Sequence, residues 1–126
     1  QDCIEQLVQR VQEHNHFILN TEIEYHHCLT SADELQLYRV IQEAVNNIIK
    51  YSKAEAAIII LNEHKEKLVV EIKDNGIGFN VGETLSSNKS FGLHNIIERS
   101  IAINGNATIT SNQNGTTIII EIPVKK

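Results

Sequence analysis

The sequence has few of the features that mark a secreted, disulfide-stabilised protein. It contains no methionine, no tryptophan and one proline, and its two cysteines, Cys3 and Cys28, form no C-x-x-C pair. Isolated cysteines in a chain rich in core-forming residues are typical of reduced thiols, so we expect a cytoplasmic location. Because the chain starts at Gln1 and has no methionine, we also expect a piece excised from a longer polypeptide.

Basic clusters and long apolar runs are also lacking. Eleven Lys and Arg against 16 Asp and Glu give a net charge of −5, and only Lys125 and Lys126 form a basic pair at the terminus. Because phosphate-backbone binding needs a basic face, we expect no nucleic-acid partner. The longest apolar run, residues 56–61, is six residues long, whereas a membrane-spanning helix needs about 20. We therefore expect no membrane contact by this domain, which leaves a membrane-anchored parent open.

Glycine is absent from the first 75 residues, and the six glycines all follow: Gly76, Gly78, Gly82, Gly92, Gly105 and Gly115. Backbone freedom is thus concentrated in the second half of the chain. The apolar fraction of 41% and the length of 126 residues suit one compact core. We expect a single domain over residues 1–126, with Gly105 and Gly115 at ordinary chain reversals.

Hydrophobic periodicity predicts helices interspersed with hairpins. Helical spacing indicates helices over residues 3–15, over 32–51 after a capping box at Ser31 and Glu34, and from Gly92 to a left-handed stop at Asn104 and Gly105. Loosely alternating apolar residues over 16–29 predict a strand and a turn. Further strands are expected over 56–61 and 67–73, joined by a turn at 62–66, and over 107–111 and 116–124. This order predicts an α/β (α+β) two-layer sandwich with a mixed, mainly antiparallel sheet and helices on one face.

A polar stripe runs along the helix expected over residues 32–51. Glu43, Asn47 and Lys50 recur at steps of three and four residues, so they lie one above another. Their spacing is compatible with an ordinary solvated face held by weak pairs. It also brings together an acid, an amide and a cation, the groups that a magnesium-bound phosphate chain uses.

A glycine-containing segment follows the strand expected over residues 67–73. Gly76, Gly78 and Gly82 have the spacing G-x-G-x-x-x-G, which is one residue too long for a dinucleotide fingerprint, and no P-loop pattern occurs. Asp74, Asn75 and Gly76 alone would suit a plain β-turn. The second glycine favours a backbone that lies close beneath a ligand.

Four motifs resemble one family in order and spacing. Glu43 to Lys50, Asp74 to Phe79, Phe91 to Leu93, and Gly115-Thr116 before Pro123 resemble the N, G1, G2 and terminal motifs of the Bergerat-type ATP-binding domain. That superfamily includes gyrase, Hsp90, histidine kinases and MutL. Over residues 1–124 the chain is most similar to sensor histidine kinases of the nitrate-sensor and desaturase-thermosensor type.

The resemblance implies a residue set for the base of ATP. Asp74 would accept a hydrogen bond from the exocyclic amine of adenine, where guanine presents an acceptor instead. Gly76 and Gly78, with Ile77 between them, would let the chain pass beneath the base. Thr116 would reach the adenine edge directly or through water.

For the phosphates, the resemblance implies that Asn47 ligates Mg²⁺, Lys50 contacts phosphate, and Glu43 acts as general base or holds a metal-bound water. Gly92 and Leu93 would open a helix whose free amides suit phosphate oxygens. Residues 80–90 would form a lid. Two positions depart from the family pattern, Tyr51 where histidine is usual and Ser90 where glycine is frequent.

The function implied is the Mg-ATP-binding catalytic domain of a two-component sensor histidine kinase. It would donate the γ-phosphoryl group to a histidine on a separate dimerisation domain, with a response regulator downstream and a homodimeric parent. Alone, it is expected to autophosphorylate negligibly. Three alternatives stay open: a serine kinase of the anti-sigma type, an ATP-gated clamp of the gyrase and Hsp90 kind, and a degenerate module that no longer binds ATP.

Overall fold

The computed structural model describes residues 6, 9, 18–24, 29–49, 53–64, 66–77 and 93–123. Within them the elements follow the order β1 (Ile18–Glu24), α2 (Ser31–Asn47), β2 (Ala56–His64), β3 (Lys67–Asp74), α4 (Leu93–Ala102), β4 (Asn106–Asn112) and β5 (Gly115–Pro123). Gln6 and Gln9 are helical. The rest of the helix expected over residues 3–15 lies outside the described residues, as do residues 80–90.

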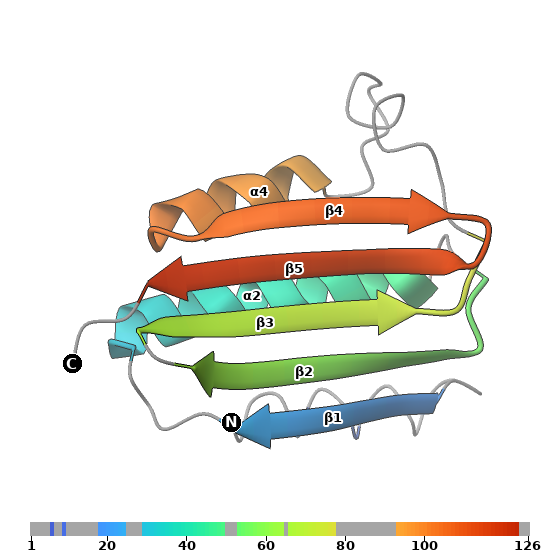
Figure 1. The fold of residues 1–126 in the computed structure, drawn as a ribbon, viewed down its shortest axis with the longest axis horizontal. Helices are drawn as coiled ribbons and strands as arrows, with labels where there is room; N and C mark the ends of the chain where they lie inside the picture. Colours follow the sequence, from blue (N-terminus) through green and yellow to red (C-terminus); the bar gives the residue numbers. More distant parts are fainter. Residues whose placement is uncertain are drawn as a thin grey trace.

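The strands form one five-stranded sheet in the order β1-β2-β3-β5-β4. β1 is parallel to β2, and the other neighbours are antiparallel. Both α2 and α4 cover the same face of this sheet (Figure 1). The structure confirms the expected two-layer sandwich with a mixed, mainly antiparallel sheet and helices on one face.

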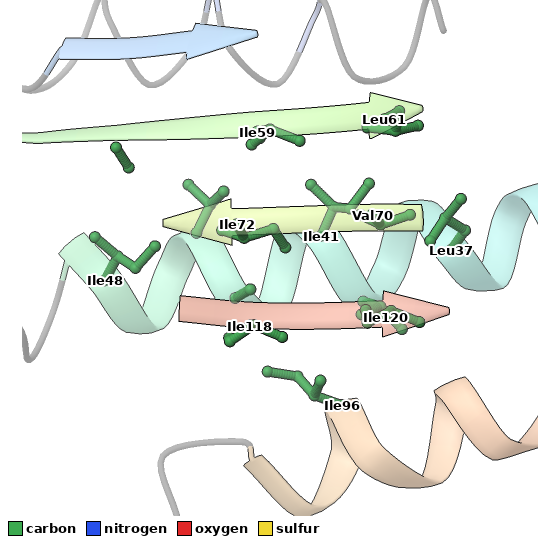
Figure 2. Close-up of a cluster of buried hydrophobic side chains, with 14 of the residues drawn as sticks. Leu37, Ile41, Ile48, Ile59, Leu61, Val70, Ile72, Ile96, Ile118 and Ile120 are labelled. Atoms are coloured by element: carbon green, nitrogen blue, oxygen red, sulfur yellow. The ribbon is translucent and has the colours of Figure 1, made fainter. Parts of the chain in front are cut away.

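The core lies between the helices and the sheet. On α2, buried residues recur at helical spacing and include Leu37, Ile41 and Ala44. Alternate residues of β2, β3 and β5 face them, among them Ile59, Ile72 and Ile120 (Figure 2). Each fully buried side chain of this size stabilises the fold by about 1.5–3 kcal/mol. The period of two along each strand fixes which side chains point toward the helices.

The helix ends differ in detail from the sequence-based expectation. The N-cap of α2 is Thr30, whose hydroxyl accepts the N–H of Asp33 at 3.1 Å, so the expected cap at Ser31 was wrong. Ser and Thr are both favoured at N-caps, and the extended backbone of Thr30 decides between the two positions. At its other end α2 stops at Asn47, and Ile48 and Ile49 continue in a wider π turn.

Helix α4 ends in a Schellman motif. The N–H of Gly105 donates to the carbonyl of Ser100 at 2.7 Å, and that of Asn104 to Ile101 at 2.9 Å. The left-handed residue is Asn104, with φ of 64°, and not Gly105. Position 105 has little room for a side chain, because a β-carbon there would lie 2.9 Å from the carbonyl oxygen of Ser100.

The hairpin between β2 and β3 is longer than expected. Pairing continues through Asn62 opposite Val69 to His64 opposite Lys67, so most of the turn expected at residues 62–66 is strand. Polar side chains mark a solvated strand end as readily as they mark a turn, because the antiparallel ladder is made by the backbone. The extension lies at the end of the hairpin away from Asp74.

Candidate functional site

Several chain segments meet at one end of the sandwich. β3 ends there at Asp74, β5 begins there, α2 ends there at Asn47, and the N-terminus of α4 is directed the same way (Figure 1). In the close-up, Ile48, Ile72 and Ile118 lie together at this end of the core (Figure 2). The fold therefore brings Asn47, Asp74 and the first residues of β5 to a common end, although they are far apart in sequence.

Asp74 presents its carboxylate on the helix-covered side of the sheet. It continues the alternation of Leu68, Val70 and Ile72, which are buried against the helices. The side chain is half-buried, and Oδ1 accepts the N–H of Gly76 at 2.8 Å. The carboxylate also accepts the N–H of Thr116. Burial raises the pKa of Asp74 above its ordinary value of 3.8, and the two backbone N–H groups partly offset this rise.

Thr116 lies beside Asp74 at the start of β5 and is 5% exposed. Its hydroxyl Oγ1 lies 2.8 Å from Oγ of Ser111, the residue opposite it on β4. Sequence reasoning missed Ser111. The register of the hairpin would have placed residue 111 opposite residue 116, but only once the turn was fixed at Gln113 and Asn114.

Gly115 has a more specific role than the expected chain reversal. Its φ is +136°, and a β-carbon built on it would overlap the backbone carbonyl oxygen of Asp74. The β4–β5 turn therefore lies directly against the end of β3. Only glycine permits both this backbone angle and this contact.

The loop after Asp74 presents a buried glycine and an exposed apolar side chain. Gly76 is buried, and Ile77 next to it is 57% exposed. An exposed isoleucine beside a polar acceptor can pack on the plane of an aromatic ring while the acceptor binds its edge. Gly78 lies outside the described residues.

Asn47 and Glu43 lie one helical turn apart near the C-terminal end of α2, and both are partly buried. The Nδ2 atom of Asn47 is buried and has no hydrogen-bond partner among the described residues. A buried amide without a partner costs about 1–3 kcal/mol, which makes it a candidate for a ligand contact. Leu93, at the start of α4, is 3% exposed and packs in the core.

Several expected site residues cannot be placed: Lys50, Gly78, Gly92 and the departures Tyr51 and Ser90 lie outside the described residues. In the described ranges, no three His, Cys, Asp or Glu side chains gather in a way that could hold a metal ion. A metal bound by Asn47 would thus need oxygen atoms of the ligand to complete its shell. The described helices include none long and apolar enough to cross a membrane.

Comparison with known proteins gives consistent matches. A family described as histidine kinase-, DNA gyrase B-, and HSP90-like ATPase matches residues 32–126. The signal transduction histidine-protein kinase/phosphatase DegS of Brevibacillus brevis is 42% identical over 92 residues, which cover 72% of this chain and 23% of that protein. The sensor protein VraS of Staphylococcus saprophyticus is 37% identical over 94 residues, which cover 74% and 26%. The chain spans about a quarter of the length of these relatives.

Solved structures share the fold at low sequence identity. The ATP binding domain of PrrB from Mycobacterium tuberculosis superposes with a TM-score of 0.77 at 16% identity, covering 99% of this chain and 93% of that one. The histidine kinase AdeS of Acinetobacter baumannii gives 0.83 at 15% identity, covering 99% and 64%. These likenesses show the same mixed sheet with helices on one face.

Proposed function

We propose that this chain, which belongs to the family of histidine kinase-, DNA gyrase B-, and HSP90-like ATPases and is the catalytic ATPase domain of a two-component sensor histidine kinase, binds Mg-ATP between Asn47 and Asp74. Its fold is the Bergerat ATP-binding fold. The observation that carries the proposed site is the half-buried carboxylate of Asp74, which two backbone N–H groups hold at the end of the sheet.

Asp74 would bind the adenine base. An ionised carboxylate accepts hydrogen bonds only, so it suits the exocyclic amine of adenine and opposes the carbonyl that guanine has at this position. Ile77 would pack on the face of the base, and Thr116 would contact its edge. Gly76 and Gly78 would leave room for the base above the backbone.

Asn47 would hold Mg²⁺ together with phosphate oxygens. Its amide oxygen is a hard, neutral ligand for the metal, and its buried Nδ2 has no hydrogen-bond partner in the described part of the chain and is therefore available to donate to the ligand. Bound Mg²⁺ would supply neutralisation of phosphate charge. Lys50 would contact phosphate directly, and, as the family resemblance implies, the N–H groups of Gly92 and Leu93 would contact the phosphate oxygens.

The proposed reaction transfers the γ-phosphoryl group to a histidine on a separate dimerisation domain of a homodimeric parent. The bond from the γ-phosphorus to the bridging oxygen breaks, ADP leaves with the electron pair, and a bond to an imidazole nitrogen forms. Glu43, one turn before Asn47, would take the imidazole proton. A response regulator would then receive the phosphoryl group, in the cytoplasm.

Titration calorimetry of this chain with Mg-ADP tests the binding site. We expect measurable binding that weakens by about tenfold or more in Asp74→Ala, because a hydrogen bond to a charged group contributes about 1.5–3 kcal/mol. Asp33→Ala, which removes a carboxylate at the opposite end of α2, should bind as the unmodified chain does. No heat with Mg-ADP, or equal heat in Asp74→Ala, would refute the site.

A second measurement tests the separate acceptor domain. Incubation of this chain alone with radiolabelled ATP should give negligible protein-bound phosphate. Adding a dimerisation domain from a histidine-protein kinase of this family should give acid-labile, base-stable phosphohistidine on the added domain. Substantial labelling of the isolated chain would contradict this part of the proposal.

A further inference from the structure

Ser111 stands behind Thr116 in a chain of hydrogen bonds that crosses three strands. Oγ of Ser111 on β4 lies 2.8 Å from Oγ1 of Thr116 on β5. The N–H of Thr116 donates to the carboxylate of Asp74 on β3, and Asp74 accepts the N–H of Gly76 in the loop beyond. Ser111 therefore adjoins the base-binding group without being part of it.

The hydroxyl of Thr116 has a limited set of hydrogen bonds to make. It carries one hydrogen and two lone pairs, and Thr116 is 5% exposed. If Ser111 donates to Oγ1, the hydrogen of Thr116 stays available for a ligand. If Thr116 donated to Ser111 instead, it would present lone pairs alone to the ligand.

A purine next to Asp74 favours the first arrangement. The adenine amine that Asp74 would accept has a ring nitrogen on either side, N1 and N7, and both are acceptors. A hydroxyl beside Asp74 must therefore donate if it is to contact either ring nitrogen. Ser111, by donating to Thr116, would keep that hydrogen free and hold Oγ1 in one position.

We infer that Ser111 is a positioning and specificity-determining residue for the base: it orients the Thr116 hydroxyl to donate to a ring nitrogen beside the adenine amine. The inference rests on the proposed ATP site. It assigns to β4 a part in nucleotide recognition, although β4 is an edge strand of the sheet and is separated from Asp74 by β5.

A ligand series provides the test, with ADP, 1-deaza-ADP and 7-deaza-ADP titrated in the presence of Mg²⁺ into the chain. We expect one of the two deaza analogues to bind the unmodified chain about three- to tenfold more weakly than ADP, as the loss of one neutral hydrogen bond gives. In Ser111→Ala this preference should shrink toward one, while the preference between ADP and the other analogue stays unchanged. Ser111→Thr, which keeps the hydroxyl, should restore it.

The control is Thr110→Ala on the exposed side of the same strand, which should keep the preference. If Ser111→Ala does not fold, Ser111→Cys provides a similar volume with a weak donor and should show the same loss. An unchanged preference in a folded Ser111 variant would overturn the inference and leave the ATP site intact. Absence of ADP binding to the unmodified chain would instead overturn the proposed function itself.

Discussion

Asn75 and Ala56 are joined by two hydrogen bonds that run in opposite directions. The N–H of Asn75 donates to the carbonyl of Ala56 at 3.2 Å, and the N–H of Ala56 donates to Oδ1 of Asn75 at 3.1 Å. The same Oδ1 accepts the N–H of Glu55 at 3.0 Å. The loop that follows Asp74 is thereby tied to the start of β2.

Replacing Asn75 should loosen this loop. Asn75→Ala removes the acceptor of two backbone N–H groups, so we expect the free energy of unfolding to fall by about 1–2 kcal/mol and Mg-ADP affinity to fall with it. Asn75→Asp keeps an acceptor oxygen and should retain most of both. Urea unfolding and calorimetry on the three proteins measure the two effects. Equal behaviour of Asn75→Ala and the unmodified chain would show that the tie is dispensable.

The raised pKa of Asp74 predicts a stability that falls as the pH rises. Burial lifts its folded-state pKa above 3.8, so the folded chain holds this proton more tightly than the unfolded chain does. This contribution is fully present below 3.8 and is lost as the pH rises through the folded-state pKa, so the ionised carboxylate destabilises the empty site at neutral pH. The unfolding free energy of Asp74→Asn minus that of the unmodified chain should therefore increase with pH over this range, because only the unmodified chain loses this contribution. A difference that is flat or shrinks with rising pH would contradict the cause assigned.

Nucleotide binding should depend on pH in the opposite sense. The ionised carboxylate accepts the adenine amine more strongly than the protonated acid does, so Mg-ADP affinity should fall as the pH is lowered through the folded-state pKa of Asp74, which lies above 3.8. Calorimetry at several acidic pH values, with Asp74→Asn as the reference, separates this effect from other titrating groups. Affinity loss of the same size in Asp74→Asn would assign the effect elsewhere.

Gly115→Ala should disturb both the fold and the site. The added β-carbon meets the carbonyl of Asp74 and the positive φ is strained, so we expect a loss of about 2 kcal/mol or more in unfolding free energy and weaker Mg-ADP binding. Gly105→Ala provides the comparison, since its β-carbon would crowd the end of α4 instead. That variant should lose stability and bind Mg-ADP normally at a temperature where it is folded. If Gly115→Ala and Gly105→Ala weaken Mg-ADP binding equally, the close approach of Gly115 to Asp74 has no specific role in binding.

Asn47→Leu should stabilise the empty domain and abolish the effect of magnesium. Because the buried Nδ2 of Asn47 has no hydrogen-bond partner among the described residues, its removal should increase the free energy of unfolding by about 1 kcal/mol. Comparison of ADP titrations with Mg²⁺ and with EDTA should show a magnesium enhancement in the unmodified chain and none in Asn47→Leu. The adjacent Asn46 is exposed, and Asn46→Leu should keep the enhancement. A persistent enhancement in Asn47→Leu would remove Asn47 from the proposed metal site.

Local patterns predicted most of the fold. The helical spacing of Leu37 and Ile41 and the alternation in β2 and β3 are properties of short segments, and they fix which face each element buries. The choice of Thr30 over Ser31 as the cap was not predictable in this way, because both hydroxyls precede a suitable helix start. The end of a helix depends on the backbone angles of the capping residue, which the adjacent sequence alone does not determine.

The site was predicted through motifs and not through geometry. Asp74 was named for its place before two glycines, whereas its bond with the N–H of Thr116 depends on how β3 and β5 pair across a long stretch of sequence. Ser111 and the bonds of Asn75 were missed for the same reason. Their hydrogen bonds join separate segments, and the register between those segments cannot be predicted from local sequence patterns.

The place of β5 in the sheet has a consequence for synthesis of the chain. β5 is the last described strand in sequence, yet it lies between β3 and β4. While a ribosome is still making it, β3 has an open edge and β4 has no neighbouring strand, so neither the sheet nor the site proposed at Asp74 can be complete. We therefore expect nucleotide binding at the proposed site only after β5 has emerged and paired, so that binding would report completion of the sheet in the nascent domain.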